Sequence, residues 1–178
     1  MKINAGNFKY RNLEIPKEAR PTSEKVREAV FSMINQDIHS AVVLDLFAGS
    51  GSLGLEALSR GAKKCYFNEV SAKNIVVLKD NVSLCKAEEM SEISKSDFRR
   101  CLSQIGEKLD IIFLDPPYSS GYYDEAINLI AENEMLSSGG IIVAEHDIKK
   151  PLNEEYGNIK CVKKKKYGTI GVDIFINA

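Results

Sequence analysis

The stretch Val42–Gly54, VVLDLFAGSGSLG, constrains the fold of this chain more than any other stretch. An apolar run ends in small residues and leads into an amphipathic segment, which predicts a strand, a tight glycine-rich turn and the start of a helix. Gly49, Gly51 and Gly54 have the spacing G-x-G-x-x-G, and an acid, Glu69, follows Gly49 by 20 residues. This spacing is typical of a loop that binds a nucleotide cofactor.

Strand-like and helix-like segments alternate between residues 42 and 145, which predicts an α/β fold with a mostly parallel sheet and helices on both faces. Two strand-like segments, 160–167 and 170–176, follow without a helix and predict an antiparallel end to a sheet of seven strands. The other expected strands are 64–69, 92–95, 109–115 and 141–145, and the expected helices are 23–35, 52–60, 72–86, 98–105 and 122–135. We expect residues 1–20 to form a small β-hairpin extension ahead of one domain over 21–178.

Composition indicates an ordinary soluble globular protein of 178 residues, with 44% hydrophobic and 28% charged residues. The sequence shows no apolar run that could span a bilayer and no signal-peptide core, which predicts a cytoplasmic protein without membrane contact. Its four cysteines are widely spaced, so neither a metal site nor a disulfide framework is expected.

Charge is segregated along the chain. Residues 1–34 carry a net charge of +3 and residues 149–178 carry +4, whereas residues 35–148 carry −8. Basic ends suit a protein that meets a polyanion with its flanks. For Lys163–Lys166 an alternative remains open, because lysines on an exposed strand also discourage edge-to-edge pairing.

Acids stand at the carboxyl ends of four successive predicted strands: Asp45, Glu69, Asp97 and Asp115. Ligands of parallel α/β sheets bind beyond these ends, so the four acids should line one edge. Carboxylates are poor partners for phosphates, and Asp45, four residues before the first glycine, is unfavourable beside a pyrophosphate. They suit a ligand with hydroxyl and amine donors and a positive charge, and S-adenosylmethionine fits this description.

In this hypothesis Asp45 receives the ammonium group, Glu69 accepts the ribose hydroxyls, and Asp97 accepts the adenine amine beside the Phe98 backbone. The glycines let the backbone approach the ligand closely. Gly51 has an alternative role in helix–sheet packing, and Asp97 has one as the N-cap of the helix that follows. The remaining expected cofactor contacts are Phe47, Ala48, Gly49, Ser50 and Val70.

Asp115, Pro116, Pro117 and Tyr118 form a DPPY motif after the most apolar predicted strand. Two prolines make this strand end rigid, and they hold the Asp115 carboxylate and the Pro116 carbonyl in one arrangement. Two neighbouring acceptors can bind both hydrogens of an exocyclic amine, while the Tyr118 ring stacks on the base. Methylation of that amine would then depend mostly on alignment and on stabilising the pyramidal nitrogen. The alternative is a simple β-turn that ends a core strand.

Taken together, LDLFAGSGSLGLEALSRGA, DPPY, Arg20–Ile34 (RPTSEKVREAVFSMI) and Lys165–Phe175 (KKYGTIGVDIF) resemble the bacterial 16S rRNA (guanine-N2)-methyltransferases, the RsmD-like family. The resemblance covers essentially the whole chain. It implies a Rossmann-like class I methyltransferase fold, S-adenosylmethionine as donor, and the N2 amine of a guanine in 16S rRNA as acceptor. One departure is Ser71, where many relatives have an Asp two residues after the ribose-binding acid.

By position, the resemblance assigns the glycine loop and its acids to the cofactor, the DPPY motif to the guanine amine, and Arg20 and Thr22 to the mouth of the site. Basic residues of the N-terminal segment are expected to bind RNA: Lys9, Arg11, Lys17 and Arg20. The expected partner is 16S rRNA within an assembling 30S subunit, and the protein is expected to be a monomer.

Three alternatives remain. The first is N6-adenine methylation of DNA or another RNA, because DPPY serves any planar exocyclic amine. The second is a dinucleotide-dependent dehydrogenase, against which Asp45 argues. The third is a non-catalytic RNA-binding assembly factor that kept the fold, against which the intact DPPY motif argues.

Overall fold

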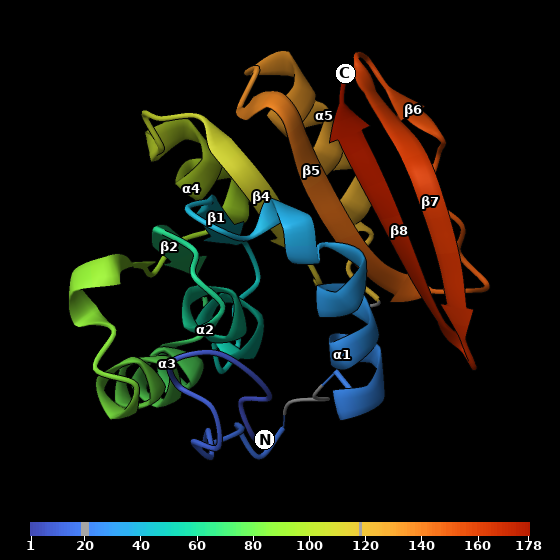
Figure 1. Ribbon diagram of the computed structural model, residues 1–178. Coiled ribbons are helices and arrows are strands. Elements are labelled where there is room, and N and C mark those ends of the chain that lie inside the picture. The colour runs from blue at the N-terminus through green and yellow to red at the C-terminus, as the bar shows by residue number, and fades with distance from the viewer. Residues whose placement is uncertain (19–21, 118) are drawn as a thin grey trace.

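A mixed β-sheet runs through the middle of the protein (Figure 1). The computed structural model describes residues 1–18, 22–117 and 119–178. The strands in these residues are β1 (Val42–Asp45), β2 (Lys64–Asn68), β3 (Ser91–Ser94), β4 (Leu109–Leu114), β5 (Leu136–Asp147), β6 (Glu155–Tyr156), β7 (Ile159–Tyr167) and β8 (Ile170–Asn177). Their order across the sheet is β3-β2-β1-β4-β5-β8-β7-β6.

The first five strands of the sequence pair in parallel, and β8 lies antiparallel between β5 and β7. The predicted parallel sheet with an antiparallel end is therefore confirmed. The described residues form eight strands, however, and not seven. The additional strand β6 has two residues that pair with Ile159 and Lys160, and so short a pairing leaves no alternating pattern in the sequence.

Five α-helices of the described chain cover the two faces of the sheet. On one face lie α1 (Glu24–Met33), α2 (Ser52–Ser59) and α3 (Ala72–Leu84), and on the other lie α4 (Phe98–Gln104) and α5 (Tyr122–Glu132). The five predicted helices are confirmed, each one to three residues shorter than expected. Among the described residues, no helix is long and apolar enough to cross a membrane.

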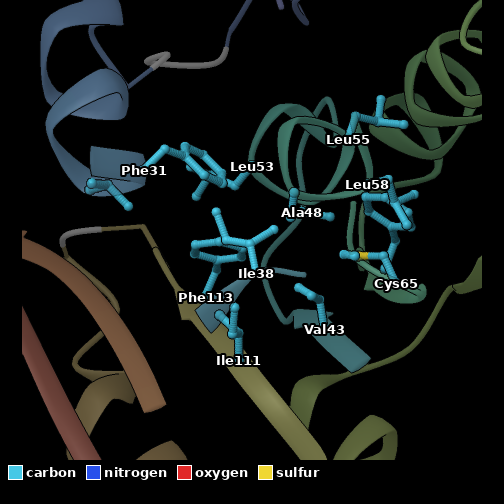
Figure 2. Packing of buried hydrophobic residues seen from close by; sticks show 14 of the residues in the cluster. Phe31, Ile38, Val43, Ala48, Leu53, Leu55, Leu58, Cys65, Ile111 and Phe113 are labelled. Atoms are coloured by element: carbon cyan, nitrogen blue, oxygen red, sulfur yellow. The ribbon is translucent and has the colours of Figure 1, made fainter. Parts of the chain in front are cut away.

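The buried side chains form one cluster on each face of the sheet. Figure 2 shows the cluster under α1 and α2, where Phe31 of α1 lies with Phe113 of β4 and Leu53 of α2. The ring centroids of Phe31 and Phe113 are 5.7 Å apart. Apolar burial on both faces explains why β4 reads as an almost continuous apolar run. It also fixes the strand ends from which the candidate site is built.

The N-terminal segment packs on this same cluster. Ile3, Phe8 and Leu13 are buried in it. The segment folds back on itself as the predicted hairpin: Lys2 and Asn12 form an antiparallel bridge, and Ile3 exchanges backbone hydrogen bonds with Arg11 and Tyr10, both at 3.0 Å. The pairing is shorter than the predicted strands, because burial of the side chains against the helices holds much of the segment. The predicted domain boundary at residue 20 lies outside the described residues.

The side chains of Arg27 (α1) and Glu56 (α2) hold this N-terminal segment against the two helices. Both side chains are fully buried, and Arg27 Nη1 lies 3.7 Å from Glu56 Oε2. The Glu56 carboxylate also accepts hydrogen bonds from the backbone N–H groups of Asn4 (3.0 Å) and Ala5 (3.2 Å). Arg27 in turn donates to the carbonyl oxygen of Lys2. One ion pair thus joins α1, α2 and the N-terminal segment.

Replacing Glu56 with Ala should lower the free energy of unfolding by about 3–5 kcal/mol, because the Arg27 guanidinium would stay buried without its anion. Urea denaturation measures this change. The matched control is Glu154→Ala: Glu154 is 76% exposed and pairs with Lys164 at the surface, so its loss should change stability by less than about 1 kcal/mol. Equal losses in the two variants would contradict the buried anchor.

Candidate active site

Three acids meet at the carboxyl edge of the sheet. Asp45 ends β1, Glu69 follows β2, and Asp115 follows β4. Asp45 is 2% exposed, and this burial raises its pKa to about 7. A hydrogen bond from Gly54 opposes the shift, while the negative charge of Glu69 adds to it. The edge is therefore a region of unfavourable negative charge in which a cation would be stabilised.

Backbone N–H groups of the glycine loop bind two of these acids. The Gly54 N–H donates to Asp45 Oδ2 at 3.0 Å, and the Gly49 N–H donates to Glu69 Oε2 at 2.8 Å. Glu69 Oε1 accepts a second bond, from the Ser71 N–H at 2.9 Å. Ser71 is also the N-cap of α3, so the turn after Glu69 is closed here without the Asp of many relatives.

Two glycines of the loop have different reasons to be glycine. Gly51 precedes α2 with φ of 81°, and a Cβ there would stand 2.4 Å from Leu78 Cδ1. A glycine at position 51 therefore lets the start of α2 pack closely against Leu78 of α3. Gly49 also has a positive φ, 55°, but a Cβ there would meet no atom within 4 Å. The open space beside Gly49 is room in which a ligand can approach the backbone.

Asp97, the fourth predicted acid, has a different environment. Its side chain is 51% exposed, and it caps α4 by accepting the Arg99 N–H at 3.0 Å. The Arg99 guanidinium lies 3.1 Å from Asp97 and also pairs with Glu125 of α5. The structure thus gives Asp97 the capping role and places it in an exposed ion-pair network. A contact with adenine remains a prediction.

Aromatic rings gather next to this network. Phe47 follows β1, Phe98 begins α4, and Tyr122 begins α5. The Phe47 ring is stacked with Tyr122 at 6.2 Å and tilted against Phe98 at 5.5 Å. Tyr122 was not predicted from the sequence. Its position at the first turn of a helix that follows a proline-rich strand end is the signal that could have indicated it.

Thr22 links Asp115 to a further acid, Glu145, at the end of β5. The Thr22 hydroxyl lies 3.0 Å from Glu145 Oε2 and 3.3 Å from Asp115 Oδ2. Burial, the charge of Glu145 and then the charge of Asp45 raise the pKa of Asp115 well above its usual range. Sequence analysis missed Glu145, although it too stands at the carboxyl end of a predicted strand.

Two prolines follow Asp115 in the described part of the DPPY motif. Pro116 is buried, Pro117 is exposed, and the Pro117 carbonyl accepts the Ser120 N–H at 2.9 Å. Tyr118 and Arg20, both predicted site residues, lie outside the described residues. Both the β-turn alternative and the amine-binding hypothesis stay predictions.

The structure does not bring all predicted residues to this edge. The Lys9 ammonium lies over the Tyr10 ring, 4.8 Å from its centroid, and the Arg11 guanidinium lies 5.4 Å from the Phe8 centroid. Arg11 is half-buried, so its packing role competes with a role in RNA binding. Ala48 and Ser50 are buried in the loop, and Val70 is 66% exposed beside Glu69.

A family model described as Conserved hypothetical protein 95 matches residues 1–176. The chain is 36% identical to Ribosomal RNA small subunit methyltransferase D of Haemophilus influenzae, over 99% of this chain and 94% of that protein. It is 32% identical to the Escherichia coli protein of the same name, over 98% of this chain and 89% of that protein. The chain belongs to the RsmD-like methyltransferase family. The resemblance stated from the sequence motifs is confirmed.

Solved structures agree with this family. The Escherichia coli protein yhhF has a TM-score of 0.90 and 31% identity, and the match covers 99% of this chain and 97% of that chain. An RNA methyltransferase from Salinibacter ruber in complex with S-adenosyl-L-homocysteine has a TM-score of 0.67 at 14% identity, covering 88% of this chain and 93% of that chain. The second match supports the fold, which is the Rossmann-like fold of class I methyltransferases.

The pKa of Asp45 predicts a pH dependence of stability. Because it rises from 3.8 to about 7 on folding, the folded chain binds the proton more tightly than the unfolded chain. This contribution to stability is present at low pH and is lost as the pH rises through 7. Asp45→Asn keeps an acceptor for Gly54 but has no charge, so its stability relative to wild type should be greater at pH 8 than at pH 5. Urea unfolding of the ligand-free proteins measures this; a pH-independent difference would contradict it.

Proposed function

We propose that the protein transfers a methyl group from S-adenosylmethionine to the N2 amine of a guanine in 16S ribosomal RNA. The observation that carries the proposal is the position of Asp115, fixed after β4 beside the acids of the glycine loop. The relatives named Ribosomal RNA small subunit methyltransferase D support it. Because ribosomal subunits are assembled in the bacterial cytoplasm, we place the protein there, acting as a monomer on an assembling 30S subunit.

The residues present fit the methyl donor. Gly49 leaves open space at the backbone, Glu69 offers carboxylate oxygens for the ribose hydroxyls, and Asp45 supplies negative charge for the ammonium. The rings of Phe47 and Phe98 offer apolar surface near Asp97, where the adenine would lie. When bound, the sulfonium supplies the electrophilic methyl group.

The chain's own contribution to the reaction is alignment. The Asp115 carboxylate and the Pro116 carbonyl would accept the two N–H groups of the guanine amine and turn its lone pair toward the methyl group. The Thr22 hydroxyl, which also hydrogen-bonds to Glu145, holds Asp115 in place for this role. As the new nitrogen–carbon bond forms, the bond from the methyl group to sulfur breaks, and the proton that the amine loses can leave to solvent, so no strong base beside the amine is required. Stacking of Tyr118 on the base remains part of the proposal.

Gly49→Ala tests the donor site. The variant should fold, because its Cβ meets no protein atom within 4 Å, but the methyl would fill the space proposed for the ligand. We expect its affinity for S-adenosylhomocysteine, measured by calorimetry, to fall at least about tenfold, which is 1.4 kcal/mol. Gly139→Ala is the matched control, since Gly139 also has a positive φ, 75°, and open space but lies at the other end of β5. Equal affinities in the two variants would place the donor elsewhere.

Mass spectrometry of 16S rRNA tests the reaction. The rRNA is taken from a strain without this gene and incubated with isotope-labelled S-adenosylmethionine, either naked or in assembling 30S particles. We expect label on guanine N2 with the wild-type protein, and a loss of at least about a hundredfold in rate with Asp115→Ala. Calorimetry should show that Asp115→Ala still binds S-adenosylhomocysteine.

Each other outcome has a definite meaning. Label on adenine N6 would replace the proposed acceptor with the alternative one. Near-wild-type turnover by Asp115→Ala would remove its proposed role at the amine. If the target guanine is already methylated in rRNA from the strain without this gene, the proposed substrate is wrong.

A further inference from the structure

Two lysines of β7 lie on the same face of the sheet as α1. In the β7–β8 register, Lys163 is opposite Ile174 and Lys165 is opposite Val172. Directly opposed residues of an antiparallel pair point to the same face. Ile174 and Val172 belong to the core cluster under α1, so Lys163 and Lys165 share that face. We refer to Lys163 and Lys165 as the unpaired lysines.

The register leads from these lysines to the candidate active site. Val172 of β8 pairs with Lys165 on one side and with Glu145 on the other. Neighbouring strands are about 4.8 Å apart, so the Cα atoms of Lys165 and Glu145 are about 10 Å apart on one face. Glu145 shares the Thr22 hydroxyl with Asp115. Asp115 follows β4, the strand next to β5, so the unpaired lysines lie three strands away from the proposed position of the guanine amine.

The lysines of β7 differ in their partners. Lys160 Nζ lies 3.6 Å from Glu155, and Lys164 Nζ lies 3.0 Å from Glu154. Within the part of the chain that the structure describes, neither of the unpaired lysines has an ion-pair partner, and both side chains are exposed. The charge of this face is thus available to an external anion.

An RNA strand needs such charge here. The edge is lined by the acids Asp45, Glu69 and Asp115, which are poor partners for phosphates, so the phosphates flanking a bound guanine need cationic groups on the neighbouring surface. Ammonium groups on the neighbouring surface of β7 can supply this charge and can release counterions from the phosphates. Lys149 and Lys150, in the turn after β5, add positive charge at the same end of the sheet, where the Ile148 N–H binds the Thr169 carbonyl at 2.9 Å.

The competing explanation is protection of a sheet edge. Only the two-residue β6 pairs with the outer side of β7, and lysines on such a strand discourage edge-to-edge association. That explanation assigns the paired and the unpaired lysines the same role. A role in RNA binding requires the unpaired lysines in particular, because only they combine free charge with the face of the active site.

We propose that Lys163 and Lys165 bind phosphates of the ribosomal RNA strand that flank the target guanine. The proposal rests on the proposed function for the identity of the RNA and extends the site from the acidic edge onto β7. Phosphate contacts of this kind position the strand and carry no base specificity.

The test compares two double variants with equal loss of charge. Lys163→Gln/Lys165→Gln removes the unpaired lysines, and Lys160→Gln/Lys164→Gln removes the paired ones. Binding of unmodified 16S rRNA is measured by filter binding between about 50 and 200 mM salt. For the first variant we expect an affinity loss on the order of tenfold and a salt slope smaller by about 1.5, since each phosphate contact contributes about 0.7–0.9. The second variant should bind like wild type.

Two further measurements separate the outcomes. Lys163→Arg/Lys165→Arg should retain wild-type affinity because it keeps the charge. If the glutamine double variant aggregates, the single variants Lys163→Gln and Lys165→Gln decide the matter, since each should lower the salt slope by about 0.7–0.9. Equal slopes in the two glutamine variants, or loss of affinity in the arginine variant, would overturn the proposal. Guanine methylation by the wild type is scored separately. If the wild type does not methylate guanine but the salt slope of RNA binding still depends on the unpaired lysines, the proposed function is wrong and the proposed RNA-binding surface is supported.

Discussion

The hydrogen bond from the Gly54 N–H to the Asp45 carboxylate is the contact on which the rest of the site depends. It joins the end of β1 to the first turn of α2 within the buried interior, at 3.0 Å. The two elements come this close because position 54 has no side chain; a Cβ there would stand 2.3 Å from the Phe67 ring. Burial of a carboxylate without a cationic partner is unfavourable, as the raised pKa of Asp45 shows. The packed core on both faces stabilises the fold enough to tolerate this buried carboxylate. A cationic ligand would offset the cost of burying its charge.

The two halves of the site are held in different ways. The half proposed for the donor is local, because Asp45, Gly49, Glu69 and Ser71 lie within 27 residues of one another and are linked through backbone N–H groups. The half proposed for the acceptor is assembled over long distances in the sequence, since Thr22 is 93 residues from Asp115. The α1 helix, fixed by its core face and by the Arg27 ion pair, carries Thr22 to the strand ends. The stability of the Arg27–Glu56 ion pair and the geometry of the half proposed for the acceptor are therefore connected.

This difference explains what the sequence could predict. The alternation of strands and helices, the glycine spacing and the acids at strand ends are local patterns, and the structure has the corresponding strands, helices and loop. Glu145 obeys the same local rule, yet its contact with Thr22 spans 123 residues and leaves no pattern. The N-terminal hairpin was predicted from alternation, and its backbone does pair across the Lys2–Asn12 bridge; the extent of the pairing depends on burial against α1 and α2, which no local pattern reveals. The exposure of Arg11 depends on packing against Phe8, which no spacing rule reveals.

The acidic central segment and the basic C-terminal segment of the sequence are also separated in the structure. The acids of the central segment lie at the ends of β1, β4 and β5, in the middle of the sheet, and the lysines of the C-terminal segment lie on β7, near its edge. The register places Glu145 and Lys165 on one face, two strands apart, and Asp115 follows the strand beyond Glu145. A methyl donor with positive charge and a polyanionic acceptor place opposite demands on a binding site. A small sheet can meet both when the acids occupy the strand ends and the lysines occupy the neighbouring surface. Salt largely screens exposed charges that are more than about 8–10 Å apart, so each ligand meets mainly the charges nearest to it.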